Sequence, residues 1–374
     1  MCDFSQYGGA SKEWKAVEAE NPAPSLAGLT PVQIRAAANA TREKTASALM
    51  PKFADKIELI DVSIPARDGF ALEGRLYWPK SVPKPADGGA APALYMHLHG
   101  GGYLLGTLSS EDAICSNLAI NTSEKTPTVV LNLNYRHTPE YVYPTAWLDA
   151  QDGLAWIHDV AVPTYGIDPA HVVVGGISAG AHLTASLALE QHLGRLPKRD
   201  TPLPPLAGQV LMIPALVNTA FYGPQLAQMA SPEVSSLVEN EFAPILPVTT
   251  MAYFTDMLKI DEAKVREDDT FLSPGNATVE QVKGLPPTVF GICGLDPLRD
   301  QGLLYAKLLS EKAGVPTDVH LYRGVPHGFR RYGPEKLSVS RAWDATMENG
   351  IAWALSKPTA SNKFHVQVHG EETM

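Results

Sequence analysis

The first residue that could do chemistry is a serine between two glycines, in the segment GISAG from Gly176 to Gly180. The run HVVVGG before this segment indicates a strand, and the run AGAHLTASLALE after it indicates a helix. At such a turn a serine holds a strained backbone conformation that lifts its hydroxyl clear of the sheet, and the glycines keep Cβ atoms out of the crowded turn. The pattern predicts that Ser178 is a nucleophile, with a buried serine in a tight turn as the alternative.

A second segment, HGGG from His99 to Gly102, has groups that could stabilise negative charge. It follows the apolar run ALYMHL and therefore leaves the end of a predicted strand. Consecutive glycines leave backbone N–H groups unobstructed, and together with the N–H of Ala179 they could bind an oxyanion that forms during acyl transfer. A flexible glycine loop or a phosphate cradle would use the same residues. Against a phosphate cradle, the sequence has no GK[ST] and no GxGxxG with a downstream acid.

A nucleophilic serine needs a base, and the base needs an acid to orient it. His327 in GVPHGF follows the strand-like run DVHLY, and Asp296 in GLDPLRD follows the run PTVFGICG. Both residues are therefore expected at the same sheet edge as Ser178. Asp300 is a rival acid in the same segment, although a carboxylate there could simply favour a helix N-terminus. The chain order Ser178, Asp296, His327 is that of α/β-hydrolase catalytic triads, whereas the chymotrypsin-like and subtilisin-like orders do not fit.

The elements that must position these residues alternate along the chain. Strand-like runs occur at 56–64, 70–78, 93–98, 128–133, 171–175, 208–213, 287–292 and 317–322. Helical patterns occur at 111–121, 145–160, 179–192, 300–313 and 337–356. Strands that alternate with helices predict an α/β fold with a mostly parallel sheet and helices on both faces.

The chain is expected to divide into five segments. They are an N-terminal helical cap segment at 1–55, the first part of the core at 56–214, a helical cap insertion at 215–270, the second part of the core at 271–356, and a tail at 357–374. The FHVQVH run of the tail alternates and could pair with an edge strand. Because the tail is mainly polar, however, we expect it to be disordered.

Composition excludes several other classes of protein. Of the 374 residues 45% are hydrophobic and 19% are charged, which indicates a globular chain with a large core. The net charge of −10 gives no support for nucleic-acid binding. Three cysteines without CxxC spacing, Cys2, Cys115 and Cys293, argue against a disulfide framework and a zinc site. With no secretory signal and no apolar run long enough for a membrane span, we expect a cytoplasmic protein.

Five blocks, in order, resemble the hormone-sensitive-lipase-like, HGGG-type carboxylesterase group of the α/β-hydrolase superfamily. The blocks are HGGGY, NYRHTPEYVYPTAWLDA, YGIDPAHVVVGG with the GISAG turn, DPLRD and HGF. The resemblance implies the α/β-hydrolase fold, with an eight-stranded sheet, flanking helices and a helical cap, and it implies no metal or organic cofactor. It also implies Ser178 as nucleophile, Asp296 as acid and His327 as base. The implied oxyanion donors are Gly101, Gly102 and Ala179.

The sequence departs from the group's usual pattern in two of these blocks. The usual GDSAGG is here GISAGA, so that Ile177 replaces an acid and Ala181 replaces a glycine. The usual YRLAPE is here YRHTPE, with His137 and Thr138 in place of leucine and alanine. The triad residues are unaffected by these changes.

The expected reaction is two-step acyl transfer from a small-molecule ester or lactone with a short or medium acyl chain, such as a secondary-metabolite ester. Tyr103 and a set of cap residues are candidates for the pocket, although each is individually more typical of cap core: Trp14, Phe221, Tyr222, Met229, Met251, Tyr253 and Phe254. A cyclase or ligand-binding protein, and an amide or formamide hydrolase, could use the same site. The sequence does not indicate an oligomeric state.

Overall fold

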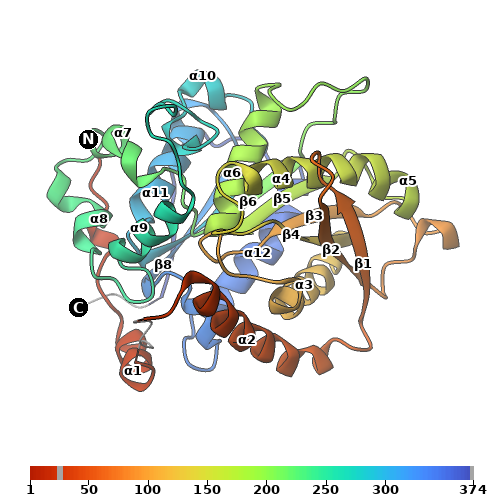
Figure 1. Cartoon of the computed structure of the whole chain (residues 1–374), viewed down its shortest axis with the longest axis horizontal. Helices are drawn as coiled ribbons and strands as arrows, with labels where there is room; N and C mark the ends of the chain where they lie inside the picture. Colours follow the sequence, from red (N-terminus) through yellow and green to blue (C-terminus); the bar gives the residue numbers. More distant parts are fainter. Residues whose placement is uncertain (23–27, 371–374) are drawn as a thin grey trace.

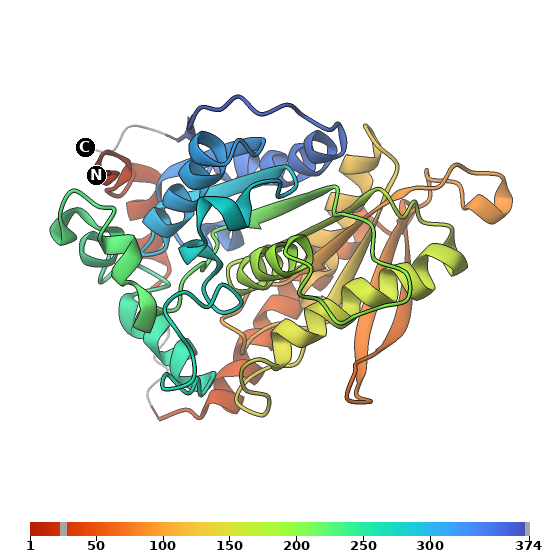
Figure 2. The same ribbon diagram turned by 90° about the horizontal axis from the view of Figure 1, so that it is seen from above.

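The computed structural model describes residues 1–22 and 28–370, which fold around a nine-stranded sheet with helices on both faces (Figures 1 and 2). The sheet order is β1-β2-β4-β3-β5-β6-β7-β8-β9. Strand β2 pairs antiparallel with β1 and β4, and all other neighbours are parallel. The strands are β1 (Ile57–Pro65), β2 (Ala71–Pro79), β3 (Ala93–Leu98), β4 (Thr128–Asn134), β5 (Val172–Ile177), β6 (Gly208–Met212), β7 (Thr288–Leu295), β8 (Thr317–Pro326) and β9 (Gln367–His369). The predicted fold class is therefore confirmed.

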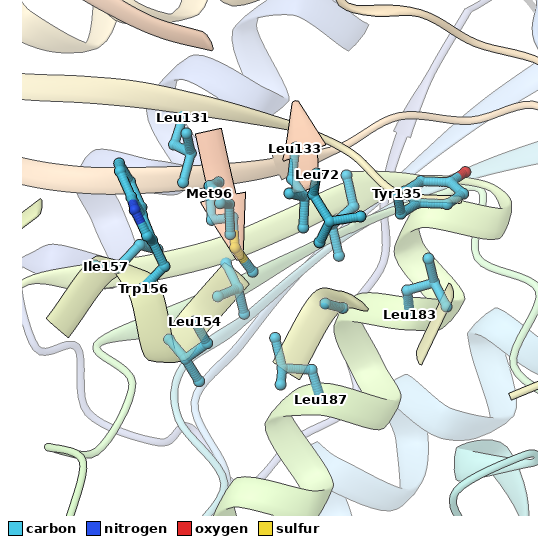
Figure 3. Close-up of a cluster of buried hydrophobic side chains, with 14 of the residues drawn as sticks. Leu72, Met96, Leu131, Leu133, Tyr135, Leu154, Trp156, Ile157, Leu183 and Leu187 are labelled. Atoms are coloured by element: carbon cyan, nitrogen blue, oxygen red, sulfur yellow. The ribbon is translucent and has the colours of Figure 1, made fainter. Parts of the chain in front are cut away.

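The central strands are apolar because helices cover both of their faces. Alternate residues of β3 enter opposite layers: Leu94 and Met96 pack with residues of α4 (Thr145–Trp156) and α6 (Ala179–His192), and Tyr95 packs with residues of α3 (Leu108–Ser123) and α12 (Ser340–Leu355). Figure 3 shows the first of these layers, where Met96, Leu131 and Leu133 meet Leu154, Leu183 and Leu187. This packing fixes the strand ends that hold the site.

Two predicted helices are interrupted near their carboxyl ends. The helix expected at 145–160 is α4 followed by a π-helical turn at Ile157–Ala161 and the short α5 (Val162–Tyr165). The helix expected at 300–313 is α11 (Arg299–Lys307) followed by a π-helical turn at Leu308–Lys312.

The segments expected to form a cap are helical in the described structure. Before the sheet come α1 (Lys12–Glu20) and α2 (Pro31–Leu49), and α2 begins with a Thr30 side chain that accepts a hydrogen bond from Gln33 N. After β6 come α7 (Gly223–Leu226), α8 (Ser236–Glu239) and α9 (Val248–Met257), and α10 (Val279–Val282) precedes β7. The start of the chain meets the insertion, because Cys2 and Met229 form a parallel bridge. Helix α2 lies along α3 (Figure 1).

The described part of the tail, residues 357–370, corrects two predictions, because it adds a strand to the expected eight-stranded sheet and is ordered where disorder was expected. Strand β9 pairs in parallel with β8, so the described sheet has a ninth strand. The alternation in FHVQVH explains the order: Phe364 and Val366 pack against an apolar cluster of the core, and Phe364 meets the ring of Phe4 at 6.2 Å between centroids. The strand also covers part of the β8 edge, whose backbone groups would otherwise be unpaired.

Among the described residues, no helix combines the length and the apolar character needed to cross a membrane.

Candidate active site

Ser178 lies between the end of β5 and the first residue of α6, in the sharp turn that the sequence predicts. Its backbone has φ 57° and ψ −114°, a region that a non-glycine residue rarely adopts. A Cβ at Gly176 would lie 2.4 Å from the carbonyl carbon of Gly180, and a Cβ at Gly180 would lie 1.9 Å from the carbonyl oxygen of Leu98. Both flanking positions therefore require glycine, because the turn leaves no room for a side chain.

His327 and Asp296 reach Ser178 from the ends of β8 and β7. The distance from Ser178 Oγ to His327 Nε2 is 2.8 Å, and that from His327 Nδ1 to Asp296 Oδ2 is 2.7 Å. Asp296 is buried, and its other oxygen accepts the N–H of Leu298 at 2.9 Å. An ionised carboxylate can only accept, so Nδ1–H donates to Asp296 and Nε2 is left to accept the serine proton. The structure thus brings the three predicted residues together in the predicted order.

Asp300, the rival acid, has different partners. Its carboxylate accepts the backbone N–H of Ser236 at 2.6 Å and the Nε–H of Arg299 at 2.9 Å. The Arg299 guanidinium also pairs with Glu239 at 2.8 Å. Asp300 therefore fastens the insertion, through α8, to the start of α11.

The HGGG loop has a conformation that only glycines tolerate. Gly101 has φ 142° and Gly102 has φ 60°. A Cβ at Gly101 would lie 2.2 Å from the carbonyl oxygen of Leu105, and one at Gly102 would lie 2.4 Å from the ring of Phe254 on α9. Within the part of the chain that the structure describes, the backbone N–H groups of Gly101, Gly102 and Ala179 donate to no other group. These donors are therefore free to bind a substrate oxygen.

His99, the first residue of the HGGG segment, is buried against Tyr135 and Gly106. Its ring stacks on Tyr135 at 4.4 Å between centroids, and its carbonyl oxygen accepts the Tyr135 hydroxyl proton at 2.8 Å. Burial lowers the pKa of His99 to about 4, so the ring is neutral at physiological pH. The loop folds back so closely that a Cβ at Gly106 would lie 2.2 Å from the His99 ring.

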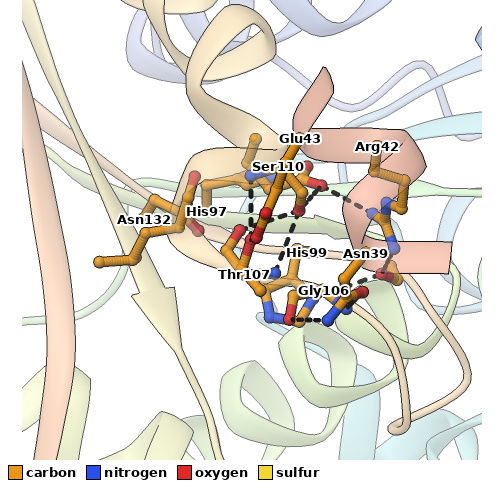
Figure 4. Close-up of polar contacts among 12 residues, drawn as sticks. Asn39, Arg42, Glu43, His97, His99, Gly106, Thr107, Ser110 and Asn132 are labelled. Carbon is orange, nitrogen blue, oxygen red and sulfur yellow. Dashed lines mark hydrogen bonds and ion pairs between the residues drawn. The ribbon is translucent and has the colours of Figure 1, made fainter. Parts of the chain in front are cut away.

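Helix α2 supplies contacts to this loop that the sequence analysis missed (Figure 4). Asn39 donates to the carbonyl of Gly106 at 3.2 Å and accepts its N–H at 2.9 Å. The Thr107 hydroxyl donates to Glu43 at 2.7 Å. No sequence motif links these residues to HGGG. The available signal is their helical spacing, which puts positions 39, 42 and 43 on one face of α2.

The predicted pocket residues divide between the core and the site. Tyr103 stacks on Trp147, its hydroxyl is hydrogen-bonded to His182 Nδ1 at 2.6 Å, and its side chain belongs to a buried core cluster. Other candidates are buried in core clusters too: Trp14, Tyr222, Met229 and Met251. Phe221 is half-buried against the core, and Tyr253 packs on Phe254 at 5.9 Å between centroids. Phe254 alone of this set is placed by its Gly102 contact directly over the HGGG loop.

Among the described residues, no group of three or more histidine, cysteine, aspartate or glutamate side chains is arranged to bind a metal ion.

His137, which replaces the leucine of the usual pattern, is expected to weaken the fold. Its Nε2 is buried with no hydrogen-bond partner among the described residues, and burial, with His99, Arg35 and Arg42 nearby, lowers its pKa well below 6.5. Below pH 6.5 the unfolded chain binds a proton at His137 that the folded chain does not bind. The free energy of unfolding therefore decreases as the pH is lowered. For His137→Leu we expect the free energy of unfolding, measured in urea at pH 7.5, to be about 1 kcal/mol higher than that of wild type. The advantage should grow by at most about 1.4 kcal/mol per pH unit below 6.5; a variant less stable than wild type at pH 5 contradicts this.

Comparisons with known proteins agree with the fold. Residues 95–331 match a family model described as an alpha/beta hydrolase fold. Esterase LipI of Mycobacterium tuberculosis is 31% identical over 74% of this chain and 76% of its own length. Versiconal hemiacetal acetate esterase of Dothistroma septosporum is 28% identical over 94% of this chain and 96% of its own length. The crystal structure of vibralactone cyclase superposes with a TM-score of 0.79 at 26% identity, over 94% of this chain and 96% of that one.

Proposed function

This chain belongs to the hormone-sensitive-lipase-like carboxylesterase group of the α/β hydrolases, and on that basis we propose that it cleaves a carboxylic ester through an acyl-enzyme on Ser178. The observation that carries the proposal is the continuous hydrogen-bonded series from Ser178 Oγ to His327 Nε2, at 2.8 Å, and from His327 Nδ1 to Asp296, at 2.7 Å. A buried carboxylate, an imidazole and a serine in this order generate a nucleophile at neutral pH.

The proposed reaction has two steps. His327 Nε2 takes the hydroxyl proton as Ser178 Oγ attacks the ester carbonyl, and the N–H groups of Gly101, Gly102 and Ala179 bind the oxyanion. His327 then gives the proton to the leaving alcohol. In the second step His327 takes a proton from water, the hydroxide attacks the acyl-enzyme, and the acid leaves as Ser178 regains its proton. Asp296 stays ionised and stabilises the imidazolium each time it forms.

We propose short or medium acyl esters or lactones as the substrate class, with helices of 1–55 and 215–270 forming the cap. Phe254 supports the choice of a short acyl chain, because its ring packs against Gly102 and limits the space above the oxyanion donors. A relative that matches 94% of the chain is, by its name, an esterase for versiconal hemiacetal acetate, which supports an ester with a short acyl chain as the substrate.

The proposal is tested with p-nitrophenyl acetate, butyrate, octanoate and longer esters, and with the matching p-nitroanilides to compare ester and amide cleavage. Rapid release of p-nitrophenol from the shorter esters, with slower cleavage of the amides, is the expected result. Absence of turnover of every one of these esters by the folded protein contradicts the proposal.

The structural likeness to a cyclase favours one alternative, in which the same serine forms a lactone instead of a free acid. Mass spectrometry in H₂¹⁸O distinguishes the two, because hydrolysis places one labelled oxygen in the acid product. A product that is an unlabelled isomer of its precursor would support the cyclase.

Phe254→Ala is expected to shift the preference toward longer acyl chains. Removal of the ring opens space above Gly102, and an added methylene in an apolar pocket is typically worth about 10-fold or more in kcat/KM. We expect the ratio of kcat/KM for the octanoate to that for the acetate to rise about 10-fold. Tyr253→Ala, on the same helix, is the matched control and should leave this ratio within about 2-fold. An unchanged ratio in Phe254→Ala means that Phe254 does not limit the acyl site.

A further inference from the structure

We propose that Arg42 on α2 is a positioning residue for the oxyanion hole, which it orients and polarises through the peptide group between Gly100 and Gly101. This inference rests on the proposed esterase function. It assigns to the N-terminal helix a part in the chemical step, beyond covering the site.

The contact is a hydrogen bond from Arg42 Nη1 to the carbonyl oxygen of Gly100, at 3.1 Å. That carbonyl and the N–H of Gly101 belong to one planar peptide unit and point in opposite directions. A donor that fixes the carbonyl therefore also fixes the direction of the Gly101 N–H, one of the proposed oxyanion donors. A cationic donor on the carbonyl polarises the unit as well, so the N–H on its other side becomes a stronger donor.

The guanidinium is itself held in place. Arg42 Nη2 donates to Glu111 Oε1 at 2.7 Å, and Glu111 Oε2 is hydrogen-bonded to His97 Nε2 at 3.2 Å. Glu111 is buried; burial raises its pKa, but Arg42 and His97 outweigh this effect and lower the pKa well below its usual range. The Glu111 carboxylate stays ionised across the physiological pH range. The guanidinium of Arg42 is therefore held between this carboxylate and the carbonyl oxygen of Gly100.

Two further contacts fix the helix relative to the loop. Asn39 exchanges two hydrogen bonds with Gly106, and Glu43 accepts one from Thr107 (Figure 4). These residues lie on the same face of α2 as Arg42, and they bracket it. Asn39 and Glu43 thus hold α2 against the segment that follows the glycines, whereas Arg42 contacts the glycine segment directly, at Gly100.

The chain offers a matched control in Arg35. This arginine lies on the same helix, pairs with a carboxylate, Glu140, at 2.6 Å, and donates to a carbonyl oxygen, that of Thr138, at 3.1 Å. Its contacts are of the same kind as those of Arg42, but they lie outside the HGGG loop. Loss of either arginine removes an α2 contact, whereas only loss of Arg42 removes the cationic donor from the Gly100 carbonyl, which then keeps its contact with His99 Nδ1 at 3.3 Å.

Arg42→Ala, Arg42→Lys and Arg35→Ala are to be compared with wild type on p-nitrophenyl butyrate. Direct removal of an oxyanion donor typically lowers kcat by about 10²–10³-fold, so loss of a group that only positions the donor should cost about 10- to 100-fold. We expect this loss in kcat for Arg42→Ala, with KM within about 3-fold, and kcat within about 2-fold of wild type for Arg35→Ala. Binding of a boronic acid, whose tetrahedral adduct mimics the oxyanion, should weaken in parallel with kcat/KM. Added guanidinium at millimolar concentration should restore part of the activity of Arg42→Ala.

Arg42→Lys keeps a charge beside the buried Glu111, so it covers the case in which the alanine variant fails to fold. Lysine cannot reach both partners with a rigid fork, and its kcat should fall at least 5-fold while its melting temperature stays near that of wild type. A lower melting temperature with unchanged kcat and boronate affinity in both variants overturns the inference and leaves the esterase proposal intact. A wild type that neither cleaves the esters nor binds the boronate overturns both.

Discussion

Ser178→Ala is expected to lower kcat for p-nitrophenyl esters by about 10⁶-fold, the size of loss found when a serine hydrolase loses its nucleophile. The alanine has no atom that can form the acyl-enzyme, and His327 Nε2 loses its partner at 2.8 Å. Residual hydrolysis should come only from the oxyanion donors and from substrate binding. The measurement is steady-state release of p-nitrophenol, with a pre-steady-state burst in wild type that is absent in the variant.

The double variant Ser178→Ala, His327→Ala provides a stricter test. Residues that act as one unit give non-additive losses, so the double variant should be about as slow as Ser178→Ala alone. Melting temperatures should stay close to that of wild type for Ser178→Ala, since alanine occupies the same backbone position. Substantial turnover in Ser178→Ala, or a double variant slower by the product of the two losses, would contradict a joint role for the two residues.

The sequence allowed the positions of these residues to be predicted because they belong to strand ends. In a parallel sheet the carboxyl ends of all strands meet at one edge, so an Asp after one strand and a His after the next must approach a Ser after a third. The predicted β3 and α6 have the bounds found in the structure, 93–98 and 179–192. Strong periodicity and flanking glycines made those elements readable.

The parts that could not be predicted depend on contacts between distant segments. The face of α2 formed by Asn39, Arg42 and Glu43 meets the HGGG loop about sixty residues further along the chain, and nothing in its local pattern specifies that partner. The tail was expected to be disordered from its polar composition. Its described part, residues 357–370, is ordered because Phe364 packs against Phe4, near the other end of the chain. The composition of a segment does not show which distant residues it contacts, whereas these tertiary contacts decide whether the segment is ordered.

The assignment of the acid leads to a second large expected effect. Asp296→Asn should lower kcat by about 10⁴-fold near neutral pH. An amide can turn its NH₂ toward His327 Nδ1, which would place the ring proton on Nε2, where it cannot accept the serine proton. Because asparagine has nearly the same size as aspartate, and Leu298 N–H can still donate to its oxygen, the fold should survive the change.

Asp300→Asn is the matched control, because it makes the same chemical change in the same segment. Asp300 accepts from Ser236 N and from Arg299, and it makes no contact with His327. We expect its kcat to stay within about 10-fold of wild type, with a lower melting temperature because the buried Arg299 loses its ion pair with Asp300 and keeps the one with Glu239. The two variants thus distinguish the role of Asp296 in catalysis from the role of Asp300 in holding the insertion 215–270 against α11. Equal losses of kcat in both, with both proteins folded, would mean that the imidazole is not oriented by Asp296 alone.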